Sequence, residues 1–559
     1  MFLKFKKEVT EVLEDSLNEL DLDVDDLGIE EPRDIADLAS TLPFSISSIL
    51  GEDPSVVGEK IVAKIDLGEL KYISDVKFKE PGYINFYVDE GKLRQMIFDI
   101  LEEPKKFMEL EDKDEKIILE HTSANPTGPL HIGHLRNALI GDTLARILER
   151  AGYSVETQYY LNDLGRQMAL LLLGVRKFGL QKSGKGDHEI GELYKRSNNF
   201  VDDSDEGDIE LIMQKFEQGD EDVLDELDSI VNYCFEGIQK TLSRLNIKHD
   251  QVVKESKFVE ENRLSEVIDS LEPNLEESDG SLQLNFQDMD KELVLKRSDG
   301  TSVYALRDLA YHKWKNKRGS MLDILGADHK LYSKQLVKAL ELMDIDSPEI
   351  IIFEFVSLPE GGMSKRKGQF ISADELIDKV QKAAFDEVSG KRQEKNQEWK
   401  EKIADLVARG AIRYDFIKVA PKKPIKFNIK KAVDLNEQGA PFIQYSFARA
   451  TSILDNSDLG SISTQEIDSL DNERSKELLK LISKMPSELK KAAEKKRPHY
   501  FAEYVFELAS KFNEFYRDVP VLQAGNANEK KARLLLVRAF KLVMEEAINI
   551  LGFEAPEEM

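Results

Sequence analysis

Apolar and polar positions alternate in two ways near the start of the chain. Phe2, Phe5 and Val9 begin a series at helical spacing, which predicts an amphipathic helix. Further on, residues 72–78 and 83–88 have the alternation of strands and are separated by the turn-forming pair Pro81-Gly82. Residues 1–110 are therefore expected to form a small α+β domain.

The pattern changes in the second region, residues 111–385. A short apolar run at 117–119 predicts a strand, and a turn-rich segment leads from it into a long helix that ends at Gly152. Residues 153–160 then have the pattern of another strand. Strand, helix and strand in this order form a βαβ unit, so we predict a Rossmann-type parallel sheet.

Residues from about 176 to 290 are acidic and mainly helical in pattern, and they contain no motif that we can connect to chemistry. We interpret them as an insertion within the parallel-sheet domain. Strand signals return at 321–325 and 350–358. The pattern is then helical almost throughout, and residues 386–559 are expected to form an all-α bundle. The predicted fold class is thus multidomain α/β.

The net charge of −28 over 559 residues argues, at face value, against a nucleic-acid binder, because neutralising phosphates requires a basic surface. The acidity is uneven, however. Residues 1–60 and 201–230 supply most of it, whereas residues 411–431 and 476–497 are strongly basic. A basic run is usually a solvated face. Two of them in the last third of the chain make a polyanionic partner a hypothesis to test.

Cysteine content and hydropathy exclude two further classes. Cys234 is the single cysteine, which excludes an intrachain disulfide and a zinc site built from cysteines, and we expect no metal site. The longest nearly unbroken apolar run, 168–175, is too short to cross a bilayer. Lys4, Lys6 and Lys7 lie where a signal peptide would be apolar. We therefore expect a cytoplasmic protein without a membrane partner.

Two of the eight histidines, His131 and His134, lie where the predicted turn meets the N-terminus of the long helix. Unpaired backbone N–H groups and the positive end of the helix dipole suit a phosphate there. Gly133 has no side chain, so a flat ligand such as adenine could approach the backbone. Imidazole donors could stabilise charge on a phosphate during displacement. The alternatives are a pair of core histidines or, with fewer supporting ligands, a zinc site.

The segment 120–134, Glu-His-Thr-Ser-Ala-Asn-Pro-Thr-Gly-Pro-Leu-His-Ile-Gly-His, resembles the HIGH signature of class I aminoacyl-tRNA synthetases. Those enzymes also carry a KMSKS loop late in the same domain. Here the predicted strand 350–358 leads into Pro-Glu-Gly-Gly-Met-Ser-Lys-Arg-Lys-Gly, in the expected order and context. Gly362 replaces a lysine of that motif, so the resemblance implies that Lys365, or Lys365 together with Lys367, contacts the α-phosphate.

The resemblance also implies a set of ATP-binding residues. ATP would be a substrate and would carry Mg²⁺, with no zinc. The implied ATP-binding residues are His131, Gly133, His134, Met363, Ser364, Lys365 and Lys367, of which His131, His134 and Lys365 are the implied catalytic residues.

Further stretches resemble the arginyl-tRNA synthetase family in particular. They are the wider run 120–142, together with 82–86, 304–308, 326–329 and 444–454. The last residues, Gly-Phe-Glu-Ala-Pro-Glu-Glu-Met, also match that family. The resemblance runs nearly end to end and leaves the acidic insertion uncovered.

A pocket that selects a guanidinium over an ammonium needs carboxylates that each accept two hydrogen bonds, because a guanidinium is a planar fork of five donors. The resemblance implies that Glu120 holds the α-amino group of arginine and Asn125 its main-chain end, while Tyr304 and Asp308 frame and pair the guanidinium. The residues alone do not separate the target of Glu120 from that of Asp308. The implied arginine-binding set is Glu120, Ser123, Asn125, His134, Tyr304, Asp308 and His329.

The predicted helical bundle resembles the anticodon-binding domain of arginyl- and cysteinyl-tRNA synthetases. Tyr445 and Arg449 lie four residues apart on one helical face, and splayed bases are held by aromatic stacking and arginine hydrogen bonds. Phe442 stands where a tyrosine is common, and Glu558 where an arginine is frequent. The 82–86 motif resembles a module that contacts the tRNA elbow. The implied tRNA-binding residues are Asn85, Phe442, Tyr445, Arg449 and Met559.

The resemblance implies an arginine-tRNA ligase that acts in two steps. ATP and L-arginine give arginyl-adenylate and pyrophosphate, and the 3'-terminal ribose of tRNA(Arg) then takes the arginyl group. We expect a monomer. The alternatives are a cysteinyl-type class I synthetase, a small-molecule nucleotidyltransferase and a catalytically inactive tRNA-binding paralogue. The cysteinyl alternative needs zinc-binding thiolates that this chain lacks.

Overall fold

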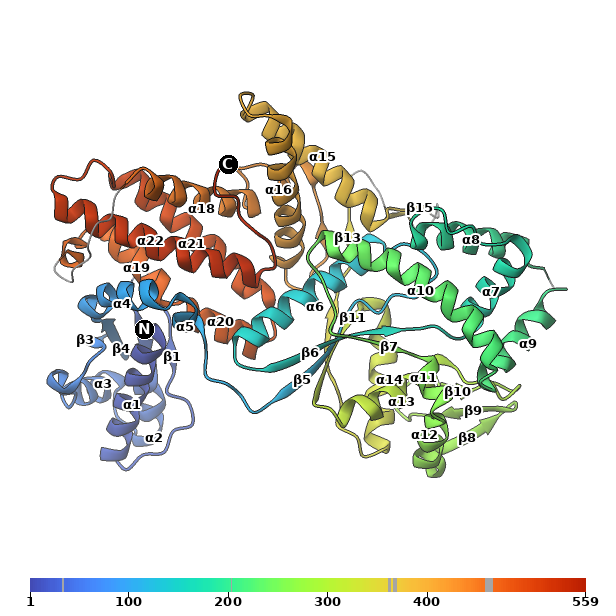
Figure 1. Cartoon of the computed structure of the whole chain (residues 1–559). Coiled ribbons are helices and arrows are strands. Elements are labelled where there is room, and N and C mark those ends of the chain that lie inside the picture. Colours follow the sequence, from blue (N-terminus) through green and yellow to red (C-terminus); the bar gives the residue numbers. More distant parts are fainter. Residues whose placement is uncertain (33–34, 203, 360–362, 365–368, 458–465) are drawn as a thin grey trace.

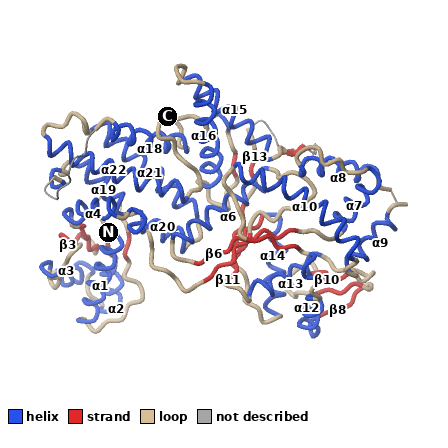
Figure 2. The backbone as a smooth tube through the Cα atoms, viewed as in Figure 1, coloured by secondary structure: helices blue, strands red, loops and turns tan. Residues whose placement is uncertain are grey.

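A parallel sheet lies at the centre of the molecule, with helices around it (Figures 1 and 2). This computed structural model describes residues 1–559 except 33–34, 203, 360–362, 365–368 and 458–465. In the described part of the chain, none of the helices combines the length and the apolar character that a bilayer span requires.

The central sheet has the strand order β12-β11-β5-β6-β7, and each neighbouring pair is parallel. The strand β5 leads through the predicted long helix, α6, into β6, so the βαβ prediction and the predicted fold class are confirmed. Since the chain returns to pair β11 on the other side of β5, the strand order reverses between these two strands. The bounds are β5 Lys116–Glu120, α6 Ile132–Arg150, β6 Ser154–Leu161, β7 Gln251–Lys254, β11 Ser320–Gly326 and β12 Glu349–Phe353.

The segment 176–290 is not one helical insertion. The strand β7 falls inside it and pairs with β6, so this part belongs to the central sheet. Four helices precede β7, and a small antiparallel sheet of order β10-β9-β8 follows it. The strand β7 has four residues, too few to show a period within an acidic sequence. The bounds are α7 Arg166–Phe178, α8 Gly186–Phe200, α9 Glu206–Glu217, α10 Glu221–Arg244, α11 Ser256–Glu260, α12 Arg263–Leu271, β8 Leu275–Ser278, β9 Ser281–Leu284 and β10 Leu293–Lys296.

The chain then continues through α13 and α14 to the end of the second region. The predicted boundary at 385/386 falls inside α15, and this helix packs along α16 of the helical bundle. The helix α15 therefore joins the two regions rather than separating them. The bounds are α13 Tyr304–Asn316, α14 Lys330–Leu342, β13 Val356–Ser357, β14 Met363–Ser364, β15 Gln369–Phe370 and α15 Ala373–Lys391.

The N-terminal region contains the predicted helix and the predicted pair of strands. Its antiparallel sheet has the order β1-β2-β4-β3. The helix α1 buries the apolar series that begins with Phe2 and Phe5. The bounds are α1 Phe2–Glu19, β1 Ile29–Glu30, β2 Leu38–Ser40, α2 Leu42–Leu50, α3 Pro54–Val62, β3 Ile73–Lys79, β4 Tyr83–Val88, α4 Glu90–Glu102 and α5 Pro104–Met108.

The last region is a helical bundle, as predicted. Figure 1 places it above the N-terminal region and beside α6. The short strand β16 pairs in parallel with β13 and so connects the bundle to the central region. The bounds are α16 Gln397–Ile417, β16 Ile425–Lys426, α17 Ile429–Ala432, α18 Ala440–Asp455, α19 Glu473–Ser483, α20 Met485–Glu494, α21 Pro498–Asp518 and α22 Ala527–Ile550.

A row of lysines along α19 and at its C-terminal end joins the bundle to the acidic N-terminal region. Lys476, Lys480 and Lys484 are spaced by four residues and therefore share one face of the helix. Their Nζ atoms lie 2.9, 2.8 and 2.8 Å from carboxylate oxygens of Glu90, Asp37 and Glu31, respectively. Part of the basic segment 476–497 is thus paired within the chain and not left free for an external polyanion.

Arg413 of α16, which also belongs to a predicted basic segment, is fully buried where three parts of the chain meet. Its guanidinium donates to the carbonyl oxygens of Leu551, at 2.8 Å, and Leu245, at 2.6 Å, and to the carboxylate of Asp142 on α6. A Cβ atom on Gly552 would lie 2.0 Å from Nη2 of Arg413, so glycine is required there. One cation thus ties α6, the end of α10 and the end of α22 together.

We predict that Arg413→Met lowers the free energy of unfolding by about 3–5 kcal/mol, because it leaves a buried carboxylate and two buried carbonyls without this donor. Calorimetric or chemical unfolding measures the loss. Arg409→Met is the control on the same helix, since the Arg409 side chain is 20% exposed and donates to the partly exposed Asp405 and to one carbonyl oxygen, that of Arg244. Its expected cost is about 1 kcal/mol or less. Equal losses for both variants would contradict this role of Arg413.

Candidate active site

The turn after β5 is held in an unusual backbone conformation. Thr122 and Ser123 have φ angles of 71° and 39°, in the left-handed region that residues with a Cβ rarely adopt. The backbone N–H of Thr122 donates to Asn137 of α6 at 2.7 Å, and Ser123 Oγ accepts from the N–H of Tyr160 at 3.1 Å. These bonds fix the path of the chain from the carboxyl end of β5 to the start of α6.

His131 and His134 form a reciprocal cap at the N-terminus of α6. His131 Nδ1 accepts from the backbone N–H groups of Gly133, at 3.0 Å, and His134, at 3.2 Å. His134 Nδ1 accepts from the N–H of His131 at 3.5 Å. The two rings are stacked with centroids 3.5 Å apart. Because Nδ1 is an acceptor in both rings, each neutral imidazole carries its proton on Nε2.

Burial keeps both rings neutral. It lowers the pKa of His131, and it lowers the pKa of His134 to about 3, with a further contribution from His131. The rings are therefore hydrogen-bond donors through Nε2 and have no free basic nitrogen. Packing also favours a glycine at position 133, since a Cβ atom on Gly133 would lie 2.9 Å from Cε1 of His131.

A cleft of about 1210 Å³ opens in front of this helix terminus. Six of the predicted site residues line it, and they come from the β5 turn, α6, α13 and the segment before α14. Asn125 is held on both sides there, since it donates to Gln167 and accepts from Asn162, each at 2.9 Å. The six residues are Ser123, Asn125, His131, His134, Tyr304 and His329.

Only part of the predicted second motif lies within the described residues. Met363 and Ser364 form β14, which pairs with β15. Lys365 and Lys367 lie outside the described residues, so their predicted phosphate contacts stay predictions. The chain just after β15 is fixed at the cleft: Ser372 forms an antiparallel bridge with His131, and the N–H of Ala373 donates to the carbonyl of Leu130 at 2.7 Å.

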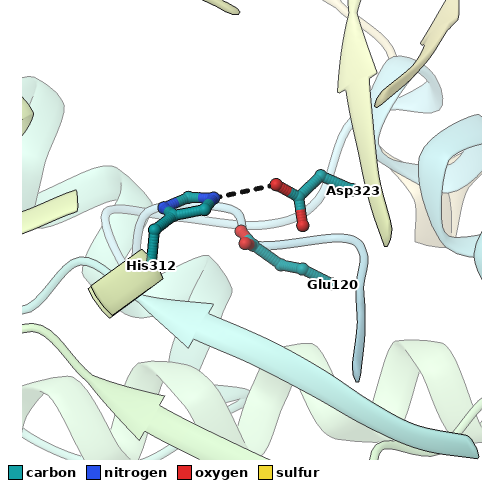
Figure 3. A group of neighbouring side chains, drawn as sticks. All are labelled: Glu120, His312 and Asp323. Carbon is teal, nitrogen blue, oxygen red and sulfur yellow. Dashed lines mark hydrogen bonds and ion pairs between the residues drawn. The ribbon is translucent and has the colours of Figure 1, made fainter. Parts of the chain in front are cut away.

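Glu120 lies at the carboxyl end of β5 in a buried cluster of charges behind the cleft (Figure 3). Its carboxylate accepts from Lys315 Nζ at 3.0 Å, and Lys315 also donates to Asp323 at 2.6 Å. Burial raises the pKa of Glu120 against the pull of Lys315. Glu120 is 7% exposed and pairs with a lysine of the chain, so its predicted contact with the arginine α-amino group stays a prediction.

His312 of α13 extends this cluster to Asp308. His312 Nε2 lies 2.9 Å from an Asp323 oxygen, and Nδ1 lies 3.1 Å from an Asp308 oxygen. Burial lowers the pKa of His312, but the carboxylates of Asp308 and Asp323 outweigh it and raise that pKa to about 10. His312 is thus a buried imidazolium, and Asp308 also accepts from the hydroxyl of Tyr332. These donors hold Asp308 beside Tyr304, whose ring lies 5.1 Å from that of Tyr332.

Glu255 lines the cleft as well and was missed in the sequence. It directly follows β7 and is 1% exposed, with one oxygen 2.9 Å from Nε of Arg307. Burial raises its pKa to about 7, although Arg307 opposes the shift. Recognising β7 as a sheet strand would have found it, because ligands bind beyond the carboxyl ends of parallel strands.

Two clusters of histidine and carboxylate groups have the proximity of metal ligands in the described residues. One is the group in Figure 3, and the other is Asp187, His188 and Asp374. Each contains a lysine ammonium: Lys315 bonds to two carboxylates of the first, and Lys185 bonds to two of the second at 2.7 Å each. The positive charge in both clusters comes from the chain itself.

A second hollow of about 690 Å³ brings together three of the predicted tRNA-binding residues, Tyr445, Arg449 and Met559. The Arg449 guanidinium lies between two rings, 4.6 Å from the centroid of Tyr445 and 4.5 Å from that of Tyr516. A main-chain oxygen of Met559 accepts from Arg392 at the same hollow. Tyr516 and Arg392 lie far from this motif in sequence, so only the fold identifies them.

Two other predicted tRNA-binding residues lie elsewhere. Phe442 packs against Phe506, with ring centroids 5.2 Å apart. Asn85 lies in β4 and is 4% exposed, so its side chain presents little surface to a partner. Their predicted contacts with tRNA stay predictions.

Comparison with known proteins accounts for these arrangements. The family described as "tRNA synthetases class I (R), catalytic domain" matches residues 96–427, "DALR anticodon binding domain" matches 443–559, and "Arginyl tRNA synthetase N terminal domain" matches 4–88.

Similar proteins match over the whole length. The chain is 42% identical to the arginine–tRNA ligase of Methanosarcina barkeri and 43% identical to that of Archaeoglobus fulgidus, each over 100% of both chains. The solved arginyl-tRNA synthetase of Thermus thermophilus superimposes with a TM-score of 0.84 at 25% identity, covering 99% of this chain and 100% of that one.

Three family matches in the expected order and relatives at 42–43% identity confirm the resemblance seen in the motifs. The chain belongs to the arginyl-tRNA synthetase family of class I aminoacyl-tRNA synthetases.

Proposed function

We propose that this chain is an arginine-tRNA ligase that activates L-arginine with ATP and then transfers it to tRNA(Arg). The observation that carries the proposal is one cleft with two kinds of group. Neutral histidine donors at a helix N-terminus and the buried carboxylate of Glu255 line the same cleft. The first suits a phosphate and the second suits a guanidinium.

In the first step, the arginine carboxylate attacks the α-phosphate of ATP, which is bound with Mg²⁺, and pyrophosphate leaves. His131 and His134 donate from Nε2 to phosphate oxygens. Because burial holds both rings neutral, they stabilise the developing charge and do not remove a proton. Lys365, with or without Lys367, supplies the positive charge. In the second step, the 3'-terminal hydroxyl of tRNA attacks the carbonyl of arginyl-adenylate and AMP leaves.

Glu255 and Asp308 bind the guanidinium of the substrate. Glu255 has one oxygen paired with Arg307, which leaves the other oxygen to accept from the ligand. Asp308 is held by Tyr332 and His312. Tyr304, which is 57% exposed, covers the guanidinium with its ring. Two carboxylates on different elements match a planar fork better than the compact ammonium of lysine.

The anticodon loop binds at the second hollow. The rings of Tyr445 and Tyr516 and the guanidinium between them offer faces for bases that leave their stack. We propose a monomeric enzyme of the cytoplasm whose partner is tRNA(Arg). The cysteinyl alternative is less favoured, because a cysteine substrate has no cation for the buried carboxylates of the cleft.

The direct test is exchange of labelled pyrophosphate into ATP. Exchange that depends on arginine, and not on lysine or cysteine, is expected when tRNA is present. Adding and omitting tRNA shows whether bound tRNA is required for activation. No arginine-dependent exchange with tRNA present would overturn the proposed function and favour an inactive paralogue.

We predict that His131→Asn lowers kcat for exchange by about 100-fold to 1000-fold, the usual effect of removing one donor to a developing charge. Asparagine is a good N-cap residue, so α6 keeps its cap and the thermal midpoint should change little. Steady-state exchange and thermal unfolding of the same preparation separate the two effects. A loss of activity only in proportion to unfolded protein would contradict the charge-stabilising role.

We also predict that kcat/KM for arginine falls about tenfold per pH unit below pH 7. The pKa of Glu255 is raised to about 7, so this carboxyl is increasingly protonated below that pH and must lose its proton to bind a cation. Glu255→Gln should raise KM by at least about 30-fold, since one partner of a buried charge pair is worth roughly 2–5 kcal/mol. The exposed Glu260→Gln is the control. A pH-independent kcat/KM would remove Glu255 from the site.

A further inference from the structure

A group of polar side chains connects the helices between β6 and β7 to the start of α15. Its centre is Asp374, in the first turn of α15, with a side chain that is 12% exposed. Four donors converge on this carboxylate, and all of them come from residues 185–244. They are Lys185 Nζ at 2.7 Å, His188 Nε2 at 2.9 Å, Thr241 Oγ1 at 3.1 Å and Arg244 Nη1 at 3.1 Å.

Lys185 is itself shared among three partners. Besides Asp374 it donates to Asp187, at 2.7 Å, and to Thr241, at 2.6 Å. Asp187 is fully buried, and a Cβ atom on Gly237 of α10 would lie 2.4 Å from its oxygen. The helices α8 and α10 are thus packed tightly around the lysine that holds Asp374. Asp187 and Asp374 are the more enclosed members of the group, because the side chains of Lys185, His188 and Arg244 are 26%, 42% and 30% exposed.

The start of α15 also contacts the N-terminus of α6, where His131 and His134 lie. Ser372, the N-cap of α15, forms a bridge with His131, and the next residue donates to Leu130. The helix α8 packs against the turn that precedes α6, because a Cβ atom on Gly191 would lie 2.9 Å from Pro129. Three elements therefore meet within a few residues of the histidine pair, and Asp374 is the charged contact between two of them.

We infer that Asp374 is a positioning residue for the ATP end of the cleft, which it controls by fixing the start of α15 against His131. The inference rests on the proposed function. The strand β15 ends just before this helix, so a shift of α15 moves the end of that strand. Residues of α8 and α15, among them Tyr194 and Glu375, line the cleft, and Asp374 makes the positions of α8, α10 and α15 interdependent.

The interaction fits a positional role better than a contribution to stability. An ion pair with a partly exposed partner, such as Lys185 or Arg244 here, is a weak source of net stability, because solvent screening and desolvation offset much of the attraction. It specifies geometry well, since the carboxylate accepts from four donors in fixed directions. Ligand placement is sensitive to small shifts, and a misplacement of about 1 Å can cost about 100-fold in rate.

The test is Asp374→Asn, which keeps the size of the side chain and removes its charge. In pyrophosphate exchange with tRNA present, we expect KM for ATP to rise about fivefold to tenfold and kcat to fall about tenfold, with KM for arginine within about twofold of its original value. Asp386→Asn is the matched control, because Asp386 is exposed on the same helix. This control should leave all three constants unchanged.

A second pair of variants protects the test against misfolding. Lys185→Met should reproduce the change in KM for ATP, and the double variant Lys185→Met with Asp374→Asn should be less impaired than the product of the single effects, because both remove the same contact. Additive effects in this cycle would overturn the coupling. A lower thermal midpoint with unchanged KM for ATP and unchanged kcat per folded enzyme would reduce Asp374 to a structural role and overturn the inference.

The outcomes also separate this inference from the proposed function. Absence of arginine-dependent exchange in the unaltered chain overturns the ligase itself. Full exchange in the unaltered chain together with normal ATP kinetics in Asp374→Asn overturns the positioning role and leaves the ligase intact.

Discussion

The parallel direction of the central strands is the constraint on which the rest of the site depends. When neighbouring strands run the same way, their carboxyl ends lie at one edge, and a reversal of strand order opens a crevice there. The order β12-β11-β5-β6-β7 reverses beside β5. At this edge, Glu120 is the last residue of β5 and Glu255 directly follows β7. The helix α6 begins beyond the edge, with His131 as its N-cap. Glu255 and the histidine pair therefore line one cleft although they lie far apart in sequence.

Buried cations hold the surrounding parts in place. Arg413 joins α6 to the ends of α10 and α22, and Arg136 of α6 donates to the carbonyls of Ala420 and Lys423 in the connection that carries β16. Lys315, which is buried, and Lys185, whose side chain is 26% exposed, also bond to carboxylates of other elements. Each of these cations donates to several oxygens at once, which fixes the positions of the elements that carry those oxygens. The region of the central sheet and the helical bundle are thus held together by hydrogen bonds and ion pairs in addition to apolar packing.

Local patterns predicted much of this fold, because α1, β3, β4, β5, α6 and β6 show their periods within a few residues. The motif at 120–134 likewise predicted the cleft, where six of the expected residues meet. The failures have a common physical cause. The strand β7 is recognisable by its pairing with β6, and Glu255 by its place after β7. The burial of Arg413 was also unpredictable, since charged residues normally lie at the surface and its partners are distant in sequence.

Acidic side chains of the N-terminal region that pair with the row of lysines must match the geometry of one helix. Three ion pairs at intervals of four residues depend on the rotational phase of one helix. Each residue turns an α-helix by about 100°, so inserting one residue between Lys476 and Lys480 would point them in different directions. The phase of this one helix thereby sets all three ion pairs to the N-terminal region at once. Length changes in α19 are consequently far more restricted than substitutions on its opposite face.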